Sequence, residues 1–165
     1  MSSTRGSGCL SPAWQAGLLA ALCLPAAGRA GTWTVDDDAP ADFSSIAVAI
    51  AAVADGDTLL VAPGTYSFFI LDKSLTILGQ AGGPRPVVTG CSRVFGAPSV
   101  TLAGLQFETL LLQYVPGPAR IDDCFIGQFD QTFQLLGVLE ATWCSQLIVT
   151  RSTLDGEYGP YPGGM

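Results

Sequence analysis

Three segments of eight residues, 100–107, 119–126 and 147–154, repeat one pattern of apolar positions without gaps. In each segment the first, third, sixth and eighth residues are apolar or small. Alternation places the apolar side chains on one face of a strand. The fourth and fifth residues of each segment let the chain turn a corner, and the strands on both sides of the corner keep their apolar side chains toward the interior. The repeats start roughly 20 to 30 residues apart, which suits one layer of a stacked repeat protein. The pattern therefore predicts short strands that lie one above another.

Stacking these segments predicts columns of similar side chains in the interior. The first column is Ile77, Leu102, Ile121 and Val149, the second is Leu105, Cys124 and Ser152, and the third is Phe107, Ile126 and Leu154. Each strand is expected to pair in parallel with its neighbours at roughly 4.8 Å. A leucine-rich repeat is the main alternative at this period, but it requires an Asn-centred pattern that the sequence lacks.

Residues 43–80 precede the repeat and combine a short helix with β-rich runs. Apolar residues at positions 46, 50 and 53 predict a helix over residues 45–54. Ser44 or Asp42 is expected to cap its N-terminus, and Gly56 to end it in the left-handed conformation. Because so short a helix is unstable alone, we expect it to lie on an apolar surface. Strands are expected at 58–62, 67–71 and 74–78, with turns at 63–66 and 72–73.

Residues 55–58 (DGDT), 63–66 (PGTY) and 75–78 (LTIL) follow Phe43 in this order. This segment resembles the start of pectin-lyase-like right-handed β-helix proteins, and the Asp-rich segment before it resembles secreted bacterial members. The resemblance implies an all-β fold, a right-handed single-stranded parallel β-helix (solenoid) of about four turns with a short N-terminal capping α-helix. It implies no catalytic residues here, since the fold hosts polysaccharide lyases, glycoside hydrolases, esterases and adhesins.

The chain is predicted to have four parts: a signal peptide at 1–30, the N-terminal strand and capping helix at 31–57, the β-helix turns at 58–155, and a Gly/Pro-rich, loop-like tail at 156–165. In the leader, Arg5 precedes an apolar run that is too short to span a membrane comfortably, and small residues follow it. Cleavage is expected after Ala30, with Gly28 as the next choice. An N-terminal anchor is the competing interpretation. The mature chain is expected to have no stable membrane span and to be secreted to the extracellular space or cell surface, with the periplasm as the alternative.

Charge and the absence of histidine exclude several classes of function. The net charge is −7, and removal of residues 1–30 takes away two arginines and no acid, which makes it −9. Nucleic acid is excluded as a partner, because phosphate binding requires a basic surface. The sequence has no histidine, which excludes His-based zinc sites and Ser-His-Asp triads. No cofactor and no metal is expected, and the Asp36–Asp38 run is expected to form a solvated turn rather than a calcium loop.

Three cysteines, Cys91, Cys124 and Cys144, remain in the mature chain. They allow three different single bridges, and their odd number leaves at least one thiol free. Cys124 belongs to an apolar column and has no histidine to activate it, so we expect an interior residue rather than a nucleophile.

Glu108 and Asp155 are the candidate catalytic pair. Each follows the last apolar residue of its segment, and Gly127 takes the equivalent place between them. Two layers of stacking would separate their backbones by roughly 9–10 Å, which overlaps the carboxylate spacing of inverting glycosidases. The alternative is structural, since any two acids in one column of such a stack have this spacing.

Asp122, Asp123 and Arg151 are the candidate ligand-binding residues. The two acids occupy the corner of the second segment, and stacking places Asp123 between Gly104 and Arg151. The structural alternative is a surface ion pair with Arg151, which contributes little to stability.

The function predicted from these features is a secreted β-helix module, non-catalytic, that interacts with polysaccharide or a cell-surface component. Aromatic residues that could stack on sugar rings, or instead fill the core and its rim, are Tyr66, Phe68, Phe69 and Phe125. The alternative function is the N-terminal piece of a carbohydrate-active enzyme, a polysaccharide lyase or glycoside hydrolase, whose active turns lie outside this chain. A gene product without a function of its own is the third interpretation.

The last turn is expected to present an open strand edge. Residues 156–165 hold four glycines and two prolines and no amphipathic helix that could cover it. An open edge pairs readily with another chain. We therefore expect either self-association at this end or further turns beyond it.

The leader predicts the N-terminus of the mature protein. The chain should be exported and should start near Gly31, because the apolar run is short and ends in small residues. Intact-mass measurement of the secreted product checks this. Retention of Met1 in a membrane fraction would instead support the anchor.

Overall fold

The computed structural model describes residues 30–127 and 139–155. The predicted signal peptide, apart from Ala30, and the predicted tail at 156–165 lie outside these described residues, as does the segment 128–138.

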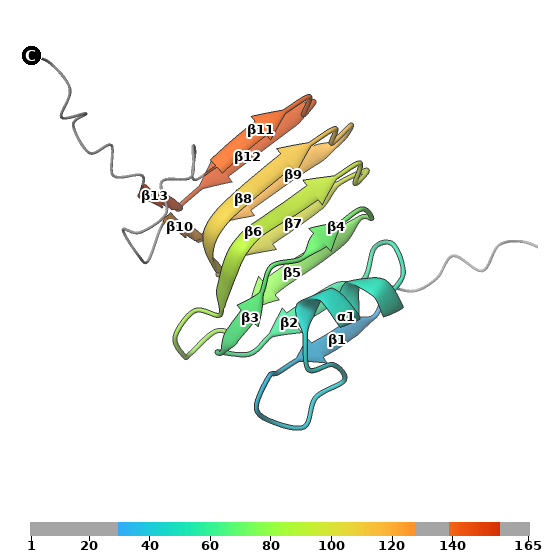
Figure 1. The fold of residues 1–165 in the computed structure, drawn as a ribbon. Helices are drawn as coiled ribbons and strands as arrows, with labels where there is room; N and C mark the ends of the chain where they lie inside the picture. Colours follow the sequence, from blue (N-terminus) through green and yellow to red (C-terminus); the bar gives the residue numbers. More distant parts are fainter. Residues whose placement is uncertain (1–29, 128–138, 156–165) are drawn as a thin grey trace, which may run out of the picture.

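Two parallel sheets make up most of the described chain (Figure 1). The first sheet has six strands in the order β1 (Thr32–Val35), β2 (Thr58–Val61), β5 (Leu75–Gly79), β7 (Val100–Ala103), β9 (Pro118–Asp122) and β12 (Gln146–Thr150). The second has the order β13 (Thr153–Asp155), β10 (Phe125–Gly127), β8 (Gln106–Gln113), β6 (Val87–Phe95) and β3 (Thr65–Ser67), with β4 (Ile70–Leu71) beside β6 and β11 (Leu139–Thr142) beside β8. Every pair between these strands is parallel, and from β5 to β10 the chain alternates between the sheets. The predictions of a mostly β chain and of parallel strands are thus confirmed.

The strand registers agree with the columns predicted from the repeat. Ile77 pairs with Leu102, Leu102 with Ile121, and Ile121 with Val149. The first three are fully buried, whereas Val149 is 38 % exposed. It lies on the last strand of its sheet, where the described residues supply no further strand to cover it. The same holds at the other sheet, where Leu154 on β13 is 51 % exposed.

The helix α1 (Ile46–Ala52) packs beside the first strands and contacts β1, β2 and β3 (Figure 1). Its apolar stripe is buried, as predicted. The predicted cap was wrong, because Ser45 and not Ser44 or Asp42 is the N-cap, with its hydroxyl accepting from the Val48 amide at 3.3 Å. Asp42 is engaged elsewhere, since its carboxylate accepts from the amide and the hydroxyl of Thr34, both at 2.8 Å.

Asp57 ties together three parts of the N-terminal end. Its carboxylate accepts from the Gly31 amide at 2.7 Å, the Trp33 indole N–H at 2.9 Å and the Ala54 amide at 3.0 Å. These hydrogen bonds, the one from Gly31 foremost, lower the pKa of Asp57 below its ordinary value. The carboxylate thereby joins β1 to the end of α1 and the start of β2. Sequence analysis placed Asp57 only within the DGDT segment and predicted none of these contacts.

Strand boundaries after β2 differ from the prediction. The predicted turn at 63–66 is partly β3, and the predicted strand at 67–71 is interrupted before β4. The interruption allows Phe69 to be buried, with its amide donating to the Ser92 hydroxyl at 3.4 Å. The long strands β6 and β8 were not foreseen as continuous. A bulge in β6 at Gly90, where φ is 79°, shifts the register between Val88 and Cys91.

Residues with left-handed backbone recur at the corners that follow strands of each sheet. One column of such corners is Gly104, Asp123 and Arg151, with φ of 66°, 49° and 51°. The other is Gly96, Tyr114 and Trp143, with φ of 72°, 56° and 58°. Glycine adopts this conformation freely, but a bulky residue does so at a cost. Each corner is followed by an inward residue, such as Leu105, Cys124, Ala97 or Val115.

Leu102→Ala tests the interior column. The side chain is fully buried between its neighbours on β5 and β9, so truncation should lower the free energy of unfolding by about 2–5 kcal/mol. Chemical denaturation measures the change. The control Thr101→Ala alters a half-buried residue on the same strand and should cost less than about 1 kcal/mol. Equal effects of the two variants would contradict the column.

Candidate functional site

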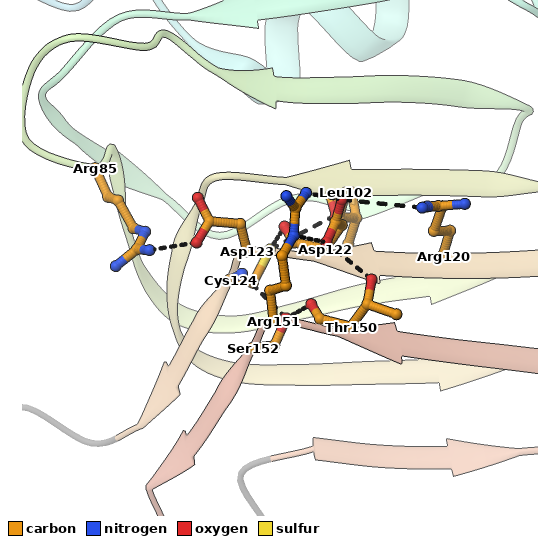
Figure 2. Close-up of polar contacts among 9 residues, drawn as sticks. All are labelled: Arg85, Leu102, Arg120, Asp122, Asp123, Cys124, Thr150, Arg151 and Ser152. Atoms are coloured by element: carbon orange, nitrogen blue, oxygen red, sulfur yellow. Dashed lines mark hydrogen bonds and ion pairs between the residues drawn. The ribbon is translucent and has the colours of Figure 1, made fainter.

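Asp122 is the centre of a polar cluster where the chain passes from the first sheet to the second (Figure 2). Its carboxylate accepts from the Thr150 hydroxyl at 2.8 Å and from the Arg151 guanidinium, Nε at 2.9 Å and Nη2 at 2.5 Å. Arg120 lies 4.0 Å away on the same strand as Asp122. Only 13 % of the Asp122 side chain is exposed. Hydrogen bonds from Arg151 and then from Thr150 lower the pKa of Asp122 to about 2.

Asp123 occupies the predicted place but has a different partner. Its amide donates to the Thr150 carbonyl, which places it at the corner beside Arg151. Its carboxylate pairs with Arg85, at 2.6 Å, from the segment before β6. The predicted ion pair with Arg151 is therefore made by Asp122, and Asp123 instead joins the corner to Arg85 (Figure 2). Asp122 thus joins two neighbouring layers, whereas Asp123 reaches past the layer of β7 and β8 to the segment between β5 and β6.

Cys124 is an interior residue, as predicted. It is buried, with its sulfur 3.4 Å from the Asp122 carbonyl and 3.6 Å from that of Leu102. Burial raises the pKa of Cys124 to about 11, so the thiol stays protonated at neutral pH. Ser152 follows it in the column, and its hydroxyl accepts from the Cys124 amide at 3.1 Å. All three described cysteines are free thiols.

Glu108 and Asp155 lie in the predicted register but do not face each other. Asp155 pairs with Gly127 on β10. The Glu108 carboxylate accepts from the Gly90 amide at 2.5 Å, which turns it toward β6, and β6 lies on the opposite side of β8 from β10 and β13. Glu108 therefore stabilises the bulge of β6, where a left-handed glycine exposes its amide.

The Asp36–Asp38 turn is organised by its own backbone. Asp36 accepts from the amides of Asp38 and Ala39 at 3.0 and 3.1 Å. Asp37 accepts from the Thr65 amide at 3.0 Å and so fixes the turn to β3. Among the described residues, no three acidic or cysteine side chains gather as a metal site.

The aromatic residues chosen from the sequence are mostly structural. Tyr66 and Phe69 are buried, and the Tyr66 hydroxyl donates to the Ala62 carbonyl at 3.0 Å. Phe125 is half-buried, and Phe68 alone of the four is exposed.

Three other aromatic residues form a continuous exposed surface, which we call the aromatic column. It consists of Phe95, Tyr114 and Trp143, which are 47 %, 54 % and 78 % exposed. They stand at the ends of β6, β8 and β11, where adjacent strands bring them together. The ring centroids of Phe95 and Tyr114 are 5.6 Å apart at 75°, and those of Tyr114 and Trp143 are 6.3 Å apart at 1°. Parallel rings in contact at that separation are displaced sideways, so part of each face stays uncovered.

The aromatic column was missed from the sequence because its members lie outside the eight-residue segments. Tyr114 and Trp143 also hold left-handed backbone, which bulky residues rarely adopt. The available signal was the placement of each ring one or two residues before a small or apolar inward residue: Phe95 two before Ala97, Tyr114 one before Val115 and Trp143 one before Cys144.

No protein-family model, no curated protein and no solved structure matches this chain. The resemblance to pectin-lyase-like proteins therefore stays a prediction. Within residues 30–127 and 139–155, no helix has the length and apolarity needed to cross a membrane.

Arg151→Ala tests the electrostatics of the corner. Removing the guanidinium should raise the pKa of Asp122 from about 2 part of the way toward the ordinary 3.8, because the Thr150 hydrogen bond and the charge of Arg120 remain. The ionised carboxylate stabilises the fold fully above pH 3.8, and this contribution is lost as the pH falls toward 2. In the variant, this stabilisation should be lost over a narrower pH range that lies closer to pH 3.8.

NMR titration of the side-chain carboxyl groups measures this shift. The matched control Arg85→Ala removes the partner of Asp123 and should leave the pKa of Asp122 where it was. A pKa of Asp122 that stays near 2 in Arg151→Ala would contradict the assignment.

Proposed function

We propose that this chain is an exported, right-handed parallel β-helix of the pectin-lyase-like type that binds carbohydrate without catalysing a reaction. The alternation of the strands between two parallel sheets supports the β-helix, as does the superposition of like residues along each column. In this arrangement α1 covers the N-terminal end of the stack, where strand edges and apolar side chains would otherwise face water.

The observation that carries carbohydrate binding is the aromatic column. Large exposed aromatic side chains that adjoin one another are uncommon on a monomer and mark interaction surfaces. Tyr114 and Trp143 in addition hold a backbone conformation that costs free energy. The same left-handed backbone occurs at Asp123 and Arg151, so it is the exposure and contact of the two rings, and not the strain, that indicates an interaction surface.

Sugar rings suit such a surface chemically. The C–H groups on the face of a pyranose are apolar and slightly positive, whereas the face of an aromatic ring carries the negative end of its quadrupole. Nucleic-acid bases also stack on aromatic rings, but the net charge of −7 opposes a polyanionic backbone. Carbohydrate is therefore the ligand class that agrees with both the rings and the charge.

The alternative, the N-terminal piece of a carbohydrate-active enzyme, would need acidic residues free to act on a substrate. Of the predicted pair, Glu108 is held by the Gly90 amide. Asp122 and Asp123 are held by arginines. Three of the four acids singled out from the sequence are thus engaged within the protein, which favours the binding module over the enzyme.

Trp143→Ala should weaken the binding of polysaccharide roughly two- to tenfold, since an aromatic contact contributes about 0.5–1.5 kcal/mol beyond its buried area. Affinity electrophoresis of the mature protein in gels containing a β-glucan, a polyuronate or chitosan measures it. The matched control is Phe68→Ala, which removes another exposed ring, 55 % against 78 % for Trp143, outside the aromatic column. Binding that both variants weaken equally, or that neither weakens, would contradict the proposal.

A further inference from the structure

Four polar side chains stand beside the aromatic column on the same strands, and we call them the polar row. They are Arg93, Gln113, Glu140 and Thr142. The register places Phe95, Gln113 and Thr142 side by side across β6, β8 and β11. One step back along the strands, it places Arg93, Leu111 and Glu140 side by side. On β6 and β8 these positions alternate with the fully buried Val94 and Leu112, so the polar row lies on the outer face of the sheet.

The side chains of the polar row have no partner among the described residues. Within residues 30–127 and 139–155, its side chains make no hydrogen bond and no ion pair. In contrast, the acids that sequence analysis singled out at the corner and in the bulge are engaged: Glu108 by an amide, Asp122 and Asp123 by arginines. Free donors and acceptors next to exposed rings supply what an aromatic surface alone lacks, which is directional contact.

The charges of the polar row are separated and balanced. Arg93 and Glu140 are two strands apart, with Leu111 between them, so their backbones are about 9–10 Å from each other. One positive and one negative group lie on the same face, together with an amide and a hydroxyl. Such a set matches hydroxyl groups, which both donate and accept hydrogen bonds, better than it matches a ligand of one charge.

We infer that the ligand of this face is a neutral glycan whose hexopyranose rings carry equatorial hydroxyl groups, lying across β6, β8 and β11. This inference rests on the proposed carbohydrate binding. A pyranose of this kind has axial C–H groups on both faces and is flat, so it can rest on Trp143 and Tyr114. Its hydroxyl groups then point outward in the plane of the ring, toward Gln113, Glu140 and Thr142.

The charge of the whole chain and of the face support a neutral ligand together. A polyuronate is repelled by the net charge of −7 and finds only one cation, Arg93, in the polar row. A polycationic amino sugar finds only one anion, Glu140, and is opposed by Arg93. A chain of neutral hydroxyl groups uses all four side chains.

Isothermal titration of the mature protein with cellohexaose, a hexagalacturonate and a chitosan hexamer tests the inference. We expect cellohexaose to bind most tightly. Glu140→Gln and Gln113→Ala should each weaken it about three- to tenfold, the effect of one lost hydrogen bond, and Trp143→Ala should also weaken it. Asp38→Asn, which removes a charge from the exposed turn near the N-terminus, is the matched control and should change nothing. Circular dichroism verifies that each variant is folded.

The outcomes separate the inference from the proposed function. Binding of cellohexaose that depends on Trp143 but not on Glu140 or Gln113 would overturn the inference and leave the proposed function standing. Tighter binding of the hexagalacturonate or of the chitosan hexamer would do the same. Absence of binding to all three, with the protein folded, would overturn both.

Discussion

The parallel, in-register pairing of strands is the constraint on which the rest of this structure depends. In both sheets each residue lies beside the equivalent residue of the next layer, as Leu102 lies beside Ile77 and Ile121. Each side chain therefore contacts the side chains at the same position in the layers above and below it. This favours columns whose members are all apolar or all polar. Apolar columns fill the interior, and Asp57, Asp122 and Glu108 each use a carboxylate to satisfy backbone or side-chain groups that the pairing leaves open.

The corners are where this constraint is relaxed. A left-handed residue turns the chain between two inward positions, and its side chain leaves the interior altogether. One column of corners carries Asp123 and Arg151, which join layers through charge, and the other carries Tyr114 and Trp143, whose rings are exposed. The same backbone conformation thus places ion pairs between layers at one column of corners and exposed aromatic rings at the other.

The repeat made the first sheet and the register of its core predictable, because inward positions must be apolar in every layer. It did not reveal β6 or β8 as long strands, since a bulge at Gly90 and two part-length partners interrupt their pattern. Stacking placed the acidic corner beside Arg151, but it pointed to Asp123, whereas Asp122 makes the pair. Arg85, the partner of Asp123, comes from a loop whose path no periodicity specifies. The aromatic column escaped prediction for the same reason: corner side chains obey no core pattern, so only the fold brings Phe95, Tyr114 and Trp143 together.

The exposure of Val149 and Leu154 has a consequence for how binding and folding are linked. Within the described residues, β11, β12 and β13 each pair with a strand on one side only, so they should open before the strands that are paired on both sides. Glu140 lies in β11, and Trp143 directly follows it. Arg93 and Phe95 lie at the end of β6, which is separated from β11 by β8. The glycan proposed above would contact all three strands. Its binding would stabilise their paired state and so reduce how often β11 to β13 open.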